Sequence, residues 1–191
     1  DHIILATGAR PREMPFMPID GEHVISSKQA LVLPKLPETM IVVGSGAIGS
    51  EFAYFYAALG VKVTIVEYLP QIMPLEDEEV AKTMERSFRK LKATILTSTT
   101  VKSVKVNAEG KCDVEVEGKK GTETLVADIV LSAVGIKSNI EGIGLDRVRA
   151  GKSLPESGFC EHPQRGQPPQ LHDPGRKHDA MERAGKQRCF P

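Results

Sequence analysis

Three glycines, Gly44, Gly46 and Gly49, are spaced so that they could cradle a diphosphate group. They directly follow an apolar run, 40–43, and they open a segment with helical spacing. At such a corner the first glycine makes the tight turn and the second lets the backbone approach a phosphate, while the third lets the helix pack against the strand. The free N–H groups and the dipole at the start of the helix would then attract the negative charge.

An acidic residue, Glu67, ends the next strand-like run, 61–66, at close to the distance of about 20 residues expected for a ribose-binding carboxylate. A carboxylate there accepts hydrogen bonds from ribose hydroxyls and repels a 2′-phosphate. The next three residues, 68–70, include no cation that could attract such a phosphate. Glycine loop and acid together predict binding of NAD in preference to NADP. Two alternatives stay open here: a nucleotide-free α/β domain whose glycines serve packing, and a methyltransferase, which combines the same two features.

The segments that must position these residues alternate between strands and helices. We expect strands at 2–6, 40–43, 61–66, 94–96 and 128–134, and helices at 26–33, 48–59 and 76–92. Between residues 101 and 126, short β-branched runs separated by glycine turns predict a β-meander. Such alternation predicts an α/β fold with a parallel sheet covered by helices.

Apolar residues recur at helical spacing in two of these helices, and in the helix at 76–92 they lie on one face. They are Ile48, Phe52, Phe55 and Leu59 in the first helix and Val80, Met84, Phe88 and Leu91 in the second.

Composition excludes several classes of protein. Lys plus Arg and Asp plus Glu both number 25, so there is no basic excess for nucleic acid or an anionic membrane. No apolar run is long enough to span a bilayer. The cysteines, Cys112, Cys160 and Cys189, have neither metal-site nor redox-motif spacing, and such sparse use fits a reducing compartment, so we expect a cytoplasmic location.

The final segment, 148–191, differs from the rest. It contains no Ile or Val after Gly151 and is interrupted by prolines, so it cannot bury enough apolar surface to offset chain entropy. We expect an irregular, disordered tail, and we hypothesise a frameshifted reading. Cysteine and histidine side chains in the tail match no ligand spacing of a metal site, and we expect no metal.

Two further segments carry a resemblance to a known family. The sequence of residues 3–11, Ile-Ile-Leu-Ala-Thr-Gly-Ala-Arg-Pro, resembles the segment that ends the first part of the FAD domain in flavoproteins with two dinucleotide-binding domains. The sequence of residues 128–135, Asp-Ile-Val-Leu-Ser-Ala-Val-Gly, resembles the segment that closes their NAD domain. The resemblance implies a three-layer, FAD/NAD(P)-binding Rossmann-like fold, with the end of an FAD domain at 1–25 and an NAD-binding domain at 26–147.

Finer detail is similar to the dihydrolipoamide dehydrogenases, a family of pyridine nucleotide-disulfide oxidoreductases. The similar stretches are 44–52, 66–67, 72–77 and 139–145. The resemblance implies the following contacts. Ala47 would lie with the glycines at the diphosphate, Glu51 and Ile48 near the nicotinamide, Glu67 on the ribose, Val101 near the adenine and Gly135 against the cofactor. Thr7 and Gly8 would lie near FAD. From the residues alone, Glu51 could equally be a carboxylate that uses the helix dipole, and Ile48 and Val101 could be core residues.

The implied parent reaction converts dihydrolipoamide and NAD to lipoamide and NADH through FAD, in a homodimer that serves 2-oxo acid dehydrogenase complexes. The family's cysteine pair and its acid–base histidine have no counterpart in these residues, so we expect this chain to bind NAD without catalysing the reaction. Another NADH-dependent flavoprotein, of the peroxidase, transhydrogenase or mercuric reductase type, and a non-catalytic NAD-binding fragment remain alternatives.

Overall fold

The computed structural model describes residues 5–144, which fall into two compact units. The larger unit spans Pro11–Gly135. The smaller unit combines Asp1–Arg10 with Ile136–Pro191, and its described parts are residues 5–10 and 136–144. The expected tail at 148–191 and its histidines and cysteines lie outside the described residues.

A five-stranded parallel sheet forms the centre of the larger unit, in the order β2-β9-β3-β4-β5. Its strands are β2 (Val24–Ile25), β3 (Thr39–Val43), β4 (Lys62–Val66), β5 (Thr94–Leu96) and β9 (Ile129–Ser132). The chain runs from β3 outward to β4 and β5 and then returns to the other side of β3 through β9. The order of strands therefore reverses beside β3.

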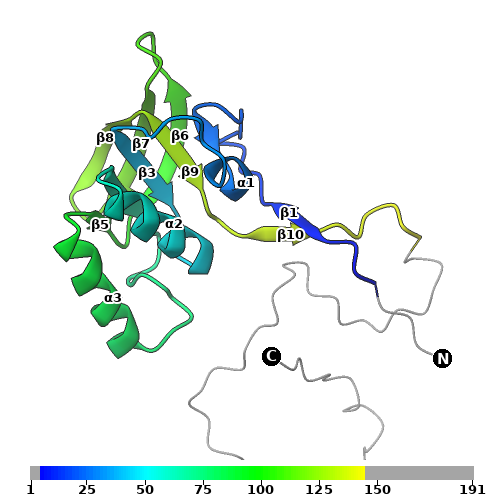
Figure 1. Cartoon of the computed structure of the whole chain (residues 1–191), viewed down its shortest axis with the longest axis horizontal. Helices are drawn as coiled ribbons and strands as arrows, with labels where there is room; N and C mark the ends of the chain where they lie inside the picture. The colour runs from blue at the N-terminus through cyan, green and yellow to red at the C-terminus, as the bar shows by residue number, and fades with distance from the viewer. Residues whose placement is uncertain (1–4, 145–191) are drawn as a thin grey trace, which may run out of the picture. The chain divides into compact units, whose positions relative to one another are not determined.

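Three helices pack on the sheet: α1 (Ser27–Ala30), α2 (Ala47–Ala58) and α3 (Glu78–Lys90). Figure 1 shows α2 and α3 on one side of the strands. A capping box fixes the start of α1, because the Ser26 side chain accepts from the N–H of Lys28 and the Gln29 side chain accepts from the N–H of Ser26. Acidic residues in the first turn of α3 and basic ones in its last turn match the helix dipole.

An antiparallel meander forms the third layer. It consists of β6 (Thr100–Val106), β7 (Cys112–Gly118) and β8 (Gly121–Ala127). Alternate residues of β3 point to opposite layers: Met40 and Val42 join the core cluster beneath the helices. Ile41 and Val43 join a second cluster with the buried valines of the meander. The expected α/β fold with helix, sheet and meander layers is confirmed.

A two-stranded sheet pairs β1 (Ala9–Pro11) with β10 (Ile136–Ser138), and all of its residues except Pro11 belong to the smaller unit. Arg10 holds this pairing through both guanidinium nitrogens: its Nη1 and Nη2 donate to the two carboxylate oxygens of Glu141 at 3.0 and 2.7 Å. The same Nη1 also donates to Oδ1 of Asn139 at 2.9 Å.

Several expected elements differ from the structure. Leu5 and Ala6 lie outside any strand, and the remainder of the strand expected at 2–6 lies outside the described residues. Strands β2 and β10 were not expected, because both are very short and lie beside glycine, serine or asparagine. The strand expected at 128–134 is confined to β9, since Gly135 adopts φ +108° before β10 begins.

In α2 the apolar residues at helical spacing are not the fully buried ones, although Ile48 and Phe52 are half-buried and Phe52 packs against the core. Phe55 and Leu59 are 53% and 49% exposed, and the residues that face the sheet are the small ones, Gly49, Ser50, Ala53 and Ala57, together with Tyr56. In α3 the predicted face is correct for Phe88, which is fully buried, whereas Val80 is exposed and Ala81 is buried in its place. Small side chains let α2 approach the strands closely, which an apolar count does not reveal.

We expect Tyr56→Phe to lower the free energy of unfolding by about 1–2 kcal/mol. The Tyr56 hydroxyl is buried and donates to the carbonyl oxygen of Ala30 at 2.5 Å, which ties α2 to α1. Burial also raises the pKa of Tyr56. Removing the hydroxyl leaves the Ala30 carbonyl without this partner. Urea unfolding checks the result, with Tyr54→Phe as the matched control because Tyr54 is 46% exposed. Equal effects of the two substitutions would contradict the structural role of this bond.

Candidate functional site

The glycine corner lies where β3 ends and α2 begins. Gly44 follows directly after β3 and adopts φ +93°, a conformation that other residues rarely adopt. A Cβ at this position would lie 2.5 Å from the carbonyl oxygen of Ala133, which follows β9. The conformation and the close backbone approach both require glycine at position 44.

The other two glycines of the motif have different surroundings. A Cβ on Gly49 would lie 2.0 Å from the carbonyl oxygen of Gly44, so only glycine lets the first turn of α2 pack against the corner. A Cβ on Gly46 would meet no atom of residues 5–144 within 4 Å. The fold therefore needs Gly44 and Gly49 for its own packing, while the space beside Gly46 is open to a ligand.

The start of α2 offers backbone donors to that space. Gly46 is the N-cap and makes no side-chain capping bond, and the first turn contains no acidic residue. Gly46 and Ala47 are exposed, and Ile48 is half-buried. Since the first N–H groups of a helix lack intrahelical acceptors, this turn can donate to an anion and also presents its positive dipole end.

Glu67 lies at the tip of β4, immediately after its last residue, and is only 3% exposed. Its Oε2 accepts from the N–H of Ser45 at 2.8 Å and from the Ser45 hydroxyl at 2.7 Å. Its Oε1 accepts from the N–H of Leu69 at 2.9 Å. The acid therefore contacts the glycine corner directly, through Ser45, a residue that the sequence reasoning did not single out. A hydroxyl between two motif glycines was the available signal.

The registers of the sheet bring these groups to one edge. Val43 pairs with Val66 on one side and with Ser132 on the other. Gly44, Glu67 and Ala133, which follow those residues, therefore lie at the carboxyl ends of three adjacent parallel strands. In open α/β sheets, ligands bind at this edge where the strand order reverses, which here is beside β3.

The remaining predicted contacts of the larger unit are placed as follows. Glu51 is exposed on the second turn of α2. Gly135 is exposed, with φ +108°, and its carbonyl accepts from the N–H of Arg12 at 3.0 Å. The side chain of Val101 is 5% exposed and packs in the core cluster beside the meander, so only its backbone could face a ligand.

Thr7 and Gly8 belong to the smaller unit and are exposed. The carbonyl of Gly8 accepts from the N–H of Asn139 at 2.9 Å, and that of Thr7 accepts from the Asn139 side chain at 3.2 Å. Gly8 adopts φ +77°, so this short turn also depends on glycine.

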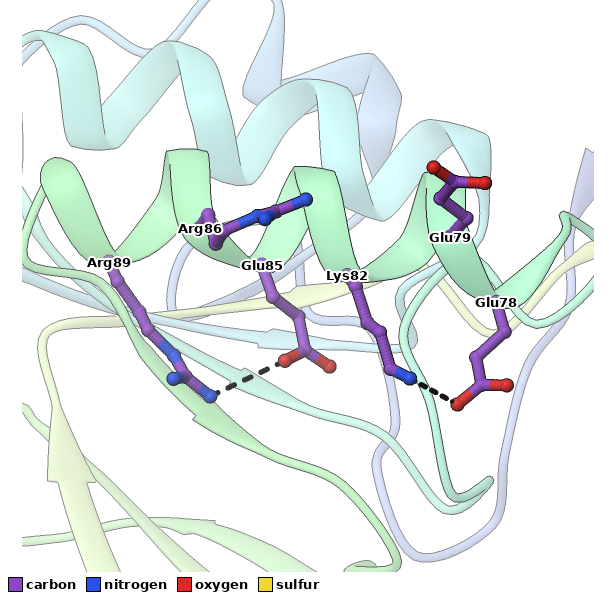
Figure 2. A pocket seen from close by; sticks show the side chains of 6 residues that line it. All are labelled: Glu78, Glu79, Lys82, Glu85, Arg86 and Arg89. Carbon is purple, nitrogen blue, oxygen red and sulfur yellow. Dashed lines mark hydrogen bonds and ion pairs between the residues drawn. The ribbon is translucent and has the colours of Figure 1, made fainter.

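Two grooves lie along the helices, and the second includes Ala47 and Ser50 at the glycine corner. One, of about 430 Å³, runs along charged residues of α3, where Lys82 pairs with Glu78 at 2.6 Å and Arg89 with Glu85 at 3.3 Å (Figure 2). All of its side chains come from one helix and are spaced as ordinary i,i+4 pairs, which are typical of a solvated helix face. The other, of about 680 Å³, lies between α2 and α3 and includes Glu51, Tyr54 and Met84.

Within residues 5–144, no group of acidic, histidine or cysteine side chains could hold a metal ion. Cys112 is buried in the core, and burial raises the pKa of its thiol to about 11, so this cysteine has the character of a packing residue. No helix of the described part is both long and apolar enough to cross a membrane.

Comparison with known proteins gives a consistent family. The model of the family described as pyridine nucleotide-disulphide oxidoreductase matches residues 1–165. Dihydrolipoyl dehydrogenases from Chlorobaculum parvum and Chlorobaculum tepidum are 44% and 45% identical to the chain over 76% and 77% of its length. The dihydrolipoyl dehydrogenase of Mycobacterium tuberculosis is 41% identical over 81% of the chain. The chain spans about a third of the length of these relatives, 31–32%.

Solved structures of similar fold support the same family. LpdA from Mycobacterium tuberculosis superposes with a TM-score of 0.67 at 34% identity, covering 80% of this chain and 32% of that one. The flavoprotein disulfide reductase RclA from Escherichia coli gives 0.59 at 29% identity, covering 70% and 30% of the two chains. A NAD-dependent persulfide reductase from A. fulgidus gives 0.59 at 28% identity, covering 69% and 25%. Because the family model matches most of its residues, this chain belongs to the pyridine nucleotide-disulphide oxidoreductase family, with dihydrolipoyl dehydrogenases among its relatives.

Proposed function

We propose that this chain is the NAD-binding portion of an FAD-dependent dihydrolipoyl dehydrogenase, whose reaction converts dihydrolipoamide and NAD to lipoamide and NADH. The observation that carries NAD binding is the buried carboxylate of Glu67 beside the glycine corner. The choice of dihydrolipoamide is supported by relatives with that name at 41–45% identity.

The residues of the corner fit a dinucleotide. The open space beside Gly46 and the uncapped start of α2 suit a diphosphate, which would lie against Gly44, Gly46 and Ala47. Gly49 would serve it indirectly, by bringing the helix close to the corner. When both cofactors are bound, FAD and NAD supply the hydride chemistry, and the chain binds and orients them.

The other cofactor contacts are part of the same proposal. Glu67 would accept from the adenosine ribose, and Ile48 and Glu51 would lie near the nicotinamide. The backbone at Val101 would lie near the adenine and Gly135 against the cofactor. Thr7 and Gly8 would contribute to FAD binding, residues 1–25 would end the FAD domain, and 26–147 would form the NAD domain.

The wider setting follows from the family as well. We propose a cytoplasmic, homodimeric parent enzyme that serves 2-oxo acid dehydrogenase complexes. These 191 residues hold no closely spaced cysteine pair, so we propose that they bind NAD without catalysing the disulfide reaction.

A second candidate is another NADH-dependent flavoprotein disulfide oxidoreductase. The resemblance to the flavoprotein disulfide reductase RclA and to the NAD-dependent persulfide reductase, at 28–29% identity, favours it. Assays of a full-length form with dihydrolipoamide or with other disulfide substrates would separate the two candidates. A non-catalytic NAD-binding product is a third reading, and it shares the binding test below.

We expect the 191-residue chain to bind NAD about 100-fold more tightly than NADP. A 2′-phosphate would have to lie beside the buried carboxylate of Glu67, and the two negative charges repel each other at short range. Glu67→Gln removes the charge at nearly constant shape. It should therefore weaken NAD binding and reduce the preference for NAD over NADP. Titration calorimetry with both nucleotides measures the two dissociation constants.

The matched control is Glu123→Gln on β8, which removes an exposed carboxylate from the meander and should change neither constant. Absence of a calorimetric signal and of a thermal shift at millimolar NAD would remove the basis for NAD binding. Binding with an unchanged preference in Glu67→Gln would instead show that the ribose contact is elsewhere.

A further inference from the structure

The residue between the first two motif glycines, Ser45, is completely buried. It contributes two donors, its N–H and its hydroxyl, and both reach the same oxygen, Oε2 of Glu67, at 2.8 and 2.7 Å. Ser45, which lies in the glycine corner proposed to bind the diphosphate, therefore also holds the Glu67 carboxylate proposed to bind the ribose.

The hydrogen bonds of Glu67 leave one carboxylate oxygen incompletely used. A carboxylate offers about four acceptor positions, two on each oxygen. Ser45 occupies both positions of Oε2, whereas Oε1 accepts, among the residues that the structure describes, only the N–H of Leu69 at 2.9 Å. Oε1 is thus the oxygen that retains an acceptor position for a ribose hydroxyl.

Ser45 is itself held firmly by two other segments. Its carbonyl oxygen accepts from the hydroxyl of Ser50, in the first half of α2, at 2.9 Å. It also accepts from the N–H of Met73, in the loop after β4, at 2.9 Å. Since the donors of Ser45 are fixed in this way, they can fix the carboxylate in turn.

We propose that Ser45 is a positioning residue for nucleotide recognition: by occupying Oε2 of Glu67, it leaves Oε1 to accept from the adenosine ribose. This inference rests on the proposed function. Without the Ser45 hydroxyl, the carboxylate keeps its bonds to the N–H groups of Ser45 and Leu69 but loses one of its three bonds and is held less firmly. The ribose must then order the acid at the moment of binding, which costs affinity.

The test compares NAD with its analogue that lacks both hydroxyls of the adenosine ribose, by titration calorimetry on the full 191-residue chain. Ser45→Ala should weaken NAD binding roughly fivefold, which is the scale of one hydrogen bond. The same substitution should leave the affinity for the analogue almost unchanged. A merely structural loss would weaken both ligands equally, because both contain the same diphosphate.

Two further variants make the result decisive. Ser50→Ala, which removes one of the two bonds that hold the Ser45 carbonyl but none to Glu67, should weaken NAD binding selectively but by less than Ser45→Ala does. In a Glu67→Gln background, Ser45→Ala should lose its selective effect. If Ser45→Ala fails to fold, Ser45→Cys retains the shape with a weak donor and must show the same selective loss.

The outcomes separate the two proposals. If the wild-type chain prefers NAD over the analogue and Ser45→Ala or Ser45→Cys leaves that preference unchanged, the positioning role is wrong and NAD binding stands. If the folded wild-type chain binds neither ligand, the proposed function is wrong and the positioning role fails with it.

Discussion

Gly46→Ala is expected to keep the fold while weakening NAD binding by more than about tenfold. A Cβ at this position meets no atom of the described part of the chain within 4 Å, and φ of −65° suits alanine. The fold thus has little use for this glycine, whereas a diphosphate lying against the backbone would collide with the added methyl group.

The measurement combines calorimetry with thermal unfolding. Glycine is preferred over alanine at an N-cap, so a stability loss of about 1 kcal/mol is allowed, corresponding to a few degrees in Tm. Full NAD affinity in the folded variant would show that the diphosphate does not contact Gly46. The corner would then be a packing device, as in a nucleotide-free α/β domain.

Gly49→Ala is expected to destabilise the fold, in contrast to Gly46→Ala. The free energy of unfolding should fall by at least about 2 kcal/mol. The added Cβ would lie 2.0 Å from the Gly44 carbonyl oxygen and 3.2 Å from the Cβ of Ala133. Backbone atoms cannot move aside as a flexible side chain can, so α2 must shift away from the corner.

Urea unfolding measures this loss, and helix propensity sharpens the test. In an unobstructed helix, replacing glycine with alanine stabilises by about 1 kcal/mol. A gain of that size in Gly49→Ala would contradict the close approach of α2 to Gly44. A loss therefore reports the packing of the corner, and comparison with Gly46→Ala separates packing from ligand binding.

The glycine corner could be predicted from the sequence because its constraints are local. Gly44 must adopt a positive φ directly after a strand, and Gly49 must lie one helical turn later against it. Those requirements fix the spacing of the two glycines in the sequence. The acid at Glu67 was found in the same way, from its distance to the glycines and its place at a strand end.

The surroundings of Glu67 could not be fully predicted, because they depend on two segments that meet only in the folded protein. The N–H of Leu69 comes from two residues further along the chain, whereas the hydroxyl of Ser45 comes from 22 residues earlier. A pattern of residue types does not give the direction of either donor. The double role of Ser45 therefore became visible only with the structure.

The fully buried residues of α2 could not be predicted for a related reason. Large apolar residues at helical spacing indicate a packed face only where the neighbouring layer leaves room for them. Here Ala53 and Ala57 contact the core, and Phe55 lies 53% exposed on the outer side. Because α2 lies close to the sheet, only small side chains fit between them. A hydrophobicity pattern carries no information about the distance between helix and sheet.

The alternation along β3 has a consequence for the length of this strand. Met40 and Val42 supply one core, Ile41 and Val43 supply the other, and Gly44 must come next. Inserting or deleting a single residue would exchange the occupants of both cores and also place a side-chain-bearing residue where the turn needs glycine. The length of this strand is therefore fixed by the two cores and the turn. Natural variation in this segment should consist of substitutions, without insertions or deletions.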